Sequence, residues 1–202
     1  MSDCNAACRR CGAYPAAFCG AFGRTMQHEK GYSHDPDDPG GMTYMGISRV
    51  WYPGWPGWMI IDSMLSVSDH PVFGHNEELQ DLVRRFYLEE FWYRLHCDWL
   101  AGISVDVALE VFDTAVNLSH RQAIEILQEA LNLLNRNELA YPDLLVDGLM
   151  GRKTRAAVKD YAARYDFELL VKLMNHLQAE QYVIRMRRDK RREKWVGWFA
   201  RT

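Results

Sequence analysis

The segment Ser104–Asn117, S-V-D-V-A-L-E-V-F-D-T-A-V-N, decides the fold class of this chain. Its apolar residues recur at intervals of three and four, as on one face of an α-helix. They are Val107, Ala108, Val111, Phe112 and Ala115. Ser104 precedes the run, and its hydroxyl can accept a hydrogen bond from the first helical turn. The segment therefore predicts a capped, amphipathic helix.

The same period recurs on both sides of this segment. It predicts helices over Tyr14–Glu29, Glu77–Ala101, Ala123–Leu134, Thr154–Tyr165 and from Asp166 past Tyr182. The helix at Ala123–Leu134 should end at Asn135-Arg136-Asn137 and Pro142. The segment Lys30–Trp58 is rich in Gly, Pro and Asp and predicts loop and turn. No strand alternation of useful length is present, so we expect a mainly α fold.

Composition limits the class of protein. The chain has 202 residues, 48% of them apolar, which suits one or two compact domains and argues against a disordered chain. A net charge of −3 argues against a binder of polyanions such as nucleic acid. No uncharged stretch reaches the ~20 apolar residues of a spanning helix. Cys11–Gly23 resembles a signal peptide only faintly, because Pro15 and three glycines interrupt it, and we expect no signal peptide.

The cysteines do not predict a disulfide framework. There are five, and Cys4, Cys8, Cys11 and Cys19 lie near the start while Cys97 stands alone. Their spacing matches no zinc pattern that we can defend, so we expect reduced thiols and no metal.

A basic segment lies near the end of the chain. Arg185–Lys194 contains seven Lys or Arg residues against two Asp or Glu residues. It is either a solvated helix face or a surface attracted to anionic envelope groups. No reading helix or stacking platform accompanies it, so we expect no nucleic-acid partner.

The segment most informative about chemistry is His28–Ser48, H-E-K-G-Y-S-H-D-P-D-D-P-G-G-M-T-Y-M-G-I-S. At 100° per residue, a continuing helix places Glu29 about three turns after Phe18, on the same apolar face. Partial desolvation there raises the pKa of Glu29 above its usual ~4.3. A protonated carboxylic acid in an apolar wall is the group that donates a proton to a glycosidic oxygen.

Three aspartates follow in a loop rich in Pro and Gly: Asp35, Asp37 and Asp38. A second carboxylate there can orient a water or stabilise an oxocarbenium ion, and the Thr43 hydroxyl can help to position that water. The alternative is an Asx-turn loop whose carboxylates bond only their own backbone. A calcium loop would need spaced oxygen ligands that this segment lacks.

These residues resemble glycoside hydrolase family 108, a family of lysozyme-like muramidases that are commonly phage or prophage endolysins. That family usually reads E-G-G-Y and G-G-x-T-N-x-G-I, whereas Lys30 here replaces a glycine and Tyr44 replaces the asparagine. The resemblance implies that Glu29 is the catalytic acid. A looser similarity to phage lysozymes implies that Asp38 and Thr43 assist it.

The resemblance covers most of the chain. R-R-F-Y-L-E-E-F-W at 84–92, D-T-A-V-N at 113–117, L-Q at 127–128, D-G at 147–148 and W-V-G-W-F-A-R at 195–201 are similar to family segments. It implies a lysozyme-like catalytic domain at 14–110 packed with a helical peptidoglycan-binding domain at 111–202. In the peptidoglycan-binding domain, Gly148 and Gly151 would form the turn before the helix that starts at Thr154.

Other residues have two interpretations. Trp51, Tyr52, Trp55 and Trp58 either stack on sugar rings or cover the core. Asp113 and Asn117 lie one helical turn apart and are best interpreted as a hydrogen-bonded pair.

Two further sets of polar residues are weighed against the glycosidase site. Glu89 and Glu90 are adjacent on a helix, so at most one would face a cleft, and we interpret both as surface residues. A zinc site using His28 and His34 lacks the second helical histidine of a zincin.

We therefore expect a peptidoglycan hydrolase that needs no cofactor and acts as a monomer on glycan strands. The expected substrate contacts are Tyr32, Asp35, Tyr44, Trp51 and Asn117. The resemblance implies a protein held in the bacterial cytoplasm until its release, acting in the periplasm or cell wall. Lys30 and Tyr44 keep an alternative open, namely a non-catalytic peptidoglycan-binding or secretion-associated protein.

Overall fold

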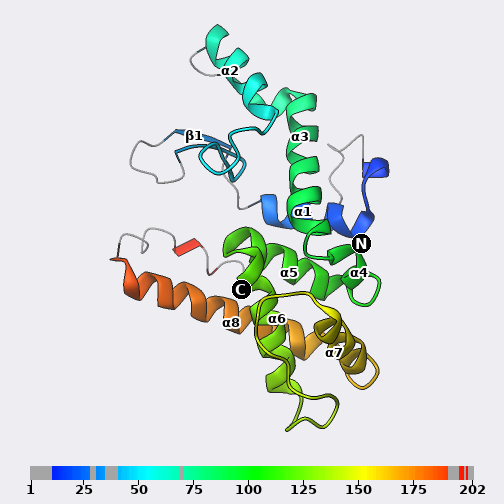
Figure 1. Cartoon of the computed structure of the whole chain (residues 1–202). Helices are drawn as coiled ribbons and strands as arrows, with labels where there is room; N and C mark the ends of the chain where they lie inside the picture. The colour runs from blue at the N-terminus through cyan, green and yellow to red at the C-terminus, as the bar shows by residue number, and fades with distance from the viewer. Residues whose placement is uncertain are drawn as a thin grey trace. The chain divides into compact units, whose positions relative to one another are not determined.

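The computed structural model describes residues 11–27, 31–34, 41–68, 71–190, 196–197 and 199. It divides the chain into two compact units, Met1–Glu90 and Phe91–Thr202, which we treat separately. Both are mainly helical, as the sequence predicted, and Figure 1 shows their elements. No helix in the described part of the chain combines the length and apolarity needed to cross a membrane.

The described residues of the first unit form three α-helices and a small sheet. The helices are α1 (Ala16–Met26), α2 (Gly57–Val67) and α3 (Glu77–Tyr87), and two 3₁₀ turns lie at Cys11–Ala13 and Phe73–His75. Asn76 caps α3 by accepting a hydrogen bond from the Leu79 N–H at 2.9 Å. Phe18, Leu79 and Val83 are among its buried core residues.

The sheet was not predicted. Strands β1 (Tyr32–His34), β2 (Met42–Tyr44) and β3 (Ile47–Ser48) pair antiparallel in that order. Strands of two or three residues are too short to show a period-two pattern, so the sequence contained no signal for them. Met45 and Gly46 both have positive φ, at 47° and 79°, as expected for the tight two-residue turn between β2 and β3.

Two helix predictions need correction. The helix α2 begins at Gly57, inside the segment predicted as loop. The predicted helix Glu77–Ala101 is interrupted: after α3 the chain forms a π-helix, η3 (Leu88–Tyr93), and α4 starts only at Cys97. The break falls at His96, whose φ of 57° lies in the left-handed region that an α-helix cannot contain.

The second unit is built from helices α4 (Cys97–Ala101), α5 (Val105–Asn117), α6 (His120–Leu134), α7 (Arg152–Ala162) and α8 (Glu168–Arg188). In this unit α5 packs against α4, α6 and α8, and α6 also packs against α7. Ser104 caps α5 as predicted, accepting from the Val107 N–H at 3.3 Å. The break predicted after α6 is confirmed, because Arg136, Asn137 and Glu138 all have positive φ.

A buried glutamine organises the loop between α6 and α7. The Gln128 side chain is 1% exposed, and its amide nitrogen donates to Asp147 Oδ1, Leu149 O and Thr154 Oγ1. Its carbonyl oxygen accepts from the N–H groups of Asp147 and Gly148 at 3.0 and 2.9 Å. Gly148 has a φ of 73°, which confirms the predicted turn before α7.

We expect Gln128→Met to lower the free energy of unfolding by about 2–4 kcal/mol, because it leaves several buried polar groups without partners. The matched control is Gln178→Met. Gln178 is also fully buried, but no described residue bonds its amide. Its replacement should change stability by less than about 1 kcal/mol or increase it. Urea denaturation of both variants measures the difference, and equal losses would contradict the role assigned to Gln128.

Stability should also depend on Asp147. The Gln128 amide and the Leu149 N–H donate to its carboxylate and hold the pKa of Asp147 below its usual value. A depressed pKa stabilises the folded state above the unfolded-state pKa of ~3.9, and this contribution is lost as pH falls through the folded-state pKa. The fall in urea midpoint between pH 7 and pH 3 should therefore be smaller in Asp147→Asn than in the unmodified protein. An equal fall in both would refute this.

Candidate active site

Helix α1 leads into the segment that carries the predicted catalytic acid. Its last described turn is buried on one side, where Thr25 and Met26 are only 1% and 9% exposed, and exposed on the other, at Arg24 and Gln27. The helix ends at Met26, shorter than the predicted range, and the Gln27 N–H still bonds to Arg24 O at 3.3 Å. Glu29 lies outside the described residues, so its predicted position on the Phe18 face stays a prediction.

The sheet fixes the residues on either side of the segment that carries the three aspartates. His34 on β1 is paired with Met42 on β2, so the segment carrying Asp35 and Asp38 starts and finishes at adjacent points. Both aspartates lie outside the described residues.

Thr43 lies in the middle of the sheet. It is half-buried and is paired with Ser33 on β1 and Ser48 on β3. Because directly paired residues share a face, the three hydroxyl side chains form a row across the sheet. Tyr32 and Tyr44 are also paired and lie on the opposite face. The sheet therefore separates Thr43 from these two predicted substrate contacts.

The opposite face of the sheet belongs to the core. Tyr44 is 2% exposed, and its hydroxyl accepts a hydrogen bond from Gln80 Nε2 at 2.6 Å. The half-buried Tyr32 ring lies 5.1 Å from the Phe73 ring, measured between centroids. As it lies, Tyr44 presents almost no surface to a substrate. Burial also raises the pKa of its hydroxyl, so this group stays protonated near neutral pH.

The remaining predicted contacts lie elsewhere. Trp51 is 73% exposed, and its ring is free to meet a ligand. Asn117 lies at the end of α5 in the second unit and donates to both the backbone oxygen and Oδ2 of Asp113, at 2.8 and 2.9 Å. The predicted Asp113–Asn117 pair is therefore present.

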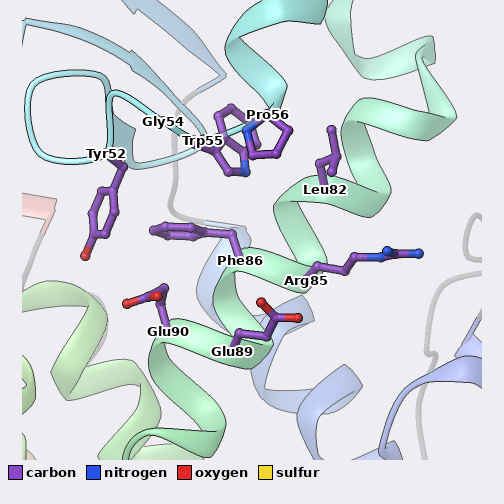
Figure 2. Close-up of a pocket in the computed structure, with 9 residues that line it drawn as sticks. All are labelled: Tyr52, Gly54, Trp55, Pro56, Leu82, Arg85, Phe86, Glu89 and Glu90. Atoms are coloured by element: carbon purple, nitrogen blue, oxygen red, sulfur yellow. The ribbon is translucent and has the colours of Figure 1, made fainter.

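A pocket of about 480 Å³ lies in the first unit, and Figure 2 shows the nine residues that line it. Its walls come from the turn before α2 and from α3: Tyr52, Gly54, Trp55, Pro56, Leu82, Arg85 and Phe86. Glu89 and Glu90 complete it. Trp55 had two interpretations from the sequence, sugar stacking or cover for the core, whereas Phe86 had not been predicted to line a site. Figure 2 places Phe86 near the centre of the pocket.

The prediction that at most one of Glu89 and Glu90 faces a cleft is wrong. Both follow α3 in the π-helix, whose hydrogen bonds join residues five apart. The wider turn reduces the angle between adjacent side chains below the 100° of an α-helix, which lets both carboxylates line one pocket. No residue type in the run L-E-E-F-W predicts the change from α-helix to π-helix.

No three His, Cys, Asp or Glu side chains among the described residues are grouped as metal ligands would be. The zinc alternative included His28, which lies outside them, while His34 is on β1. Cys97 is buried, and burial raises the pKa of its thiol well above the usual range, so it is held as a neutral core residue.

Comparison with known proteins assigns both parts of the chain. Residues 22–118 match the family described as glycosyl hydrolase 108, and residues 122–202 match a family described as a predicted peptidoglycan domain. The chain is thus a glycosyl hydrolase 108 domain followed by a predicted peptidoglycan-binding domain. The first match contains the positions of Glu29, Asp38 and Thr43. No curated protein matches the chain.

A solved structure described as that of Brucella abortus SagA is similar to this glycosyl hydrolase. The two share 18% sequence identity with a TM-score of 0.52. The match covers 91% of this chain and 96% of the other. At that identity the likeness shows a shared fold.

We expect Tyr44→Phe to lower the free energy of unfolding by about 1 kcal/mol, because it removes the acceptor of the Gln80 amide. Tyr32→Phe is the matched control, since no described residue is shown bonding its hydroxyl, and it should change stability by less than about 0.5 kcal/mol. Thermal or urea denaturation checks both. A larger loss in Tyr32→Phe would contradict this account of the sheet.

Proposed function

We propose that this glycosyl hydrolase cleaves the bond between N-acetylmuramic acid and N-acetylglucosamine in peptidoglycan. The observation that carries the proposal is that one chain matches both a glycosyl hydrolase family and a peptidoglycan domain. The second match suggests action at the cell wall, with glycan strands as the substrate. No cofactor enters the mechanism, because proton transfer between carboxyl groups and water suffices.

In this mechanism Glu29 donates a proton to the glycosidic oxygen. One side of the described end of α1, at Thr25 and Met26, is buried, which is compatible with an apolar wall next to this residue. Asp38 stabilises the developing positive charge or activates water, and the Thr43 hydroxyl helps to hold that water. Thr43 is half-buried and lies on the sheet face away from Tyr44. Its hydroxyl belongs to the row formed with Ser33 and Ser48, and such a row of hydroxyl groups can bond water.

The surrounding assignments are part of the same proposal. The catalytic domain spans 14–110 and the peptidoglycan-binding domain 111–202. Substrate contacts come from Tyr32, Asp35, Trp51 and Asn117, of which Trp51 is the most exposed among those described. Tyr44, also predicted from the sequence as a contact, is buried and instead supports the sheet. The protein acts as a monomer, and the basic segment 185–194 attracts it to anionic envelope groups.

A second candidate function is peptidoglycan binding without cleavage, as in a secretion-associated protein. The observation that favours it is the burial of Tyr44, because the position where the family usually carries an asparagine amide is here occupied by a core ring. Binding to purified sacculi without release of reducing sugars would support this candidate.

The test is lysis of permeabilised Gram-negative cells or purified sacculi, followed by mass spectrometry of the muropeptides. We expect Glu29→Gln to reduce the lytic rate at least ~100-fold, because general acid catalysis contributes about 10²–10⁴. Asp38→Asn and Thr43→Val should each reduce it less.

The matched control is Glu78→Gln. Glu78 is an exposed carboxylate in the first turn of α3, outside the pocket, and its replacement should leave the rate unchanged. Full activity in Glu29→Gln would exclude that residue as the acid. Products without a reducing N-acetylmuramic acid end would exclude muramidase specificity.

A further inference from the structure

Helix α7 holds two cations over one tryptophan ring of the second unit. Arg155 Cζ lies 5.5 Å and Lys159 Nζ 5.9 Å from the centroid of the half-buried Trp99 ring on α4. The two residues, which we call the cation pair, are one helical turn apart, and like charges at that spacing repel each other. Attraction to the ring offsets this repulsion only in part. The arrangement therefore favours an anion that contacts both cations.

The described residues supply no such anion. None of their carboxylates forms an ion pair with Arg155 or Lys159, although the exposed Asp98 is next to Trp99 in sequence. Arg155 Nε donates to the backbone oxygen of Met150 at 3.3 Å, which orients the guanidinium. Its two terminal nitrogens have no acceptor in the described part of the chain, so they can donate to a ligand.

The rest of α7 strengthens the positive charge on this side. At 100° per residue, the exposed Arg152 lies about 60° from Arg155 around the helix axis. Asp160, the acidic residue of α7, lies about 140° from Arg155. Burial and nearby charges, that of Asp160 among them, raise the pKa of Tyr141, so Asp160 lies close to that tyrosine. The carboxylate of α7 thus does not neutralise the cation pair.

We propose that the cation pair binds a free carboxylate of the peptide stems of peptidoglycan. The terminal nitrogens of Arg155 donate to the carboxylate oxygens, a geometry that the planar guanidinium matches, and the Lys159 ammonium contacts the same group. Both residues lie within the match to a predicted peptidoglycan domain at 122–202. This inference rests on the proposed function, since it names the chemical group by which the second unit recognises that substrate.

Other anionic partners fit less well. A helix that lies on a membrane surface inserts large apolar side chains beside its cations. The exposed residues of α7 include none: they are Arg152, Lys153, Ala156 and Lys159. A single-stranded nucleic acid stacks its bases on aromatic rings, whereas the Trp99 ring is already covered by the cation pair.

The experiment is co-sedimentation of the full chain, carrying Glu29→Gln, with purified Gram-negative sacculi in the cold. A second batch of sacculi has its carboxylates converted to neutral N-methylamides with carbodiimide and methylamine. We expect at least about fivefold weaker binding to the amidated sacculi. Arg155→Gln/Lys159→Gln should weaken binding to untreated sacculi about five- to tenfold and remove most of the preference for them.

The matched control is Lys153→Gln/Lys172→Gln, which removes the same charge from exposed positions of the second unit. Lys153 lies about 160° from Arg155 around α7, so this variant should bind like its parent and keep the preference for untreated sacculi. Arg155→Lys keeps the charge but loses the planar fork, and its affinity should lie between those of the parent and the double variant. Should the double variant fail to fold, Lys159→Gln and Arg155→Lys decide.

Three outcomes overturn the proposal: no binding to untreated sacculi, equal binding to amidated sacculi, or equal losses in the double variant and the control. Vesicles of phosphatidylglycerol test the other source of anions. Binding to them that needs the cation pair, together with unchanged binding to amidated sacculi, would assign the pair to lipid phosphate instead. Lysis by the unmodified protein is measured separately. Its absence with carboxylate-dependent binding intact would contradict only the proposed cleavage, and lysis without such binding would contradict only this inference.

Discussion

Aromatic packing around Tyr44 and Trp55 is the interaction on which the first unit depends. Its sheet consists of strands of only three, three and two residues, and so small a sheet is not stable without packing against other elements. Tyr44 joins the sheet to Phe73 and Trp55, and Trp55 in turn contacts Phe86 on α3. The Tyr87 hydroxyl adds a 2.7 Å hydrogen bond to the carbonyl of Met45 in the hairpin turn. These contacts fix both the strand that carries Thr43 and the walls of the pocket.

Sequence periodicity was sufficient to predict most of the helical fold. Ser104 and its following apolar residues predicted α5, and Gly148 predicted the turn before α7, because each signal lies within a few adjacent residues. The sheet, α2 and the π-helix were missed for different reasons. The strands are too short to show alternation of apolar and polar residues. Helix α2 starts beside the Pro and Gly residues at 53–57, which favour turns. The π-helix was missed because no residue type distinguishes its pitch from that of an α-helix.

The candidate site was predicted through its motif rather than its geometry. Glu29, Asp35 and Asp38 lie outside the described residues, so their proposed roles rest on the resemblance of the motif, and the family match over 22–118 includes their positions. Thr43 and Tyr44 are adjacent in sequence, and pairing in the sheet places them on opposite faces, which the motif alone does not reveal. The pocket depends on residues about thirty positions apart, Trp55 and Phe86, and only the folded chain brings them together.

The π-helix at Leu88–Tyr93 affects how the lining of this pocket can change between related proteins. Both acidic side chains reach the cavity only while the backbone keeps its wider turn. Removing a single residue from this stretch would restore ordinary α-helical pitch and rotate one carboxylate away, although every pocket side chain would keep its chemical identity. Whether both carboxylates line this wall thus depends on the number of residues in the segment as well as on their type. Relatives that keep both glutamates can therefore still differ in the ligands that this pocket binds.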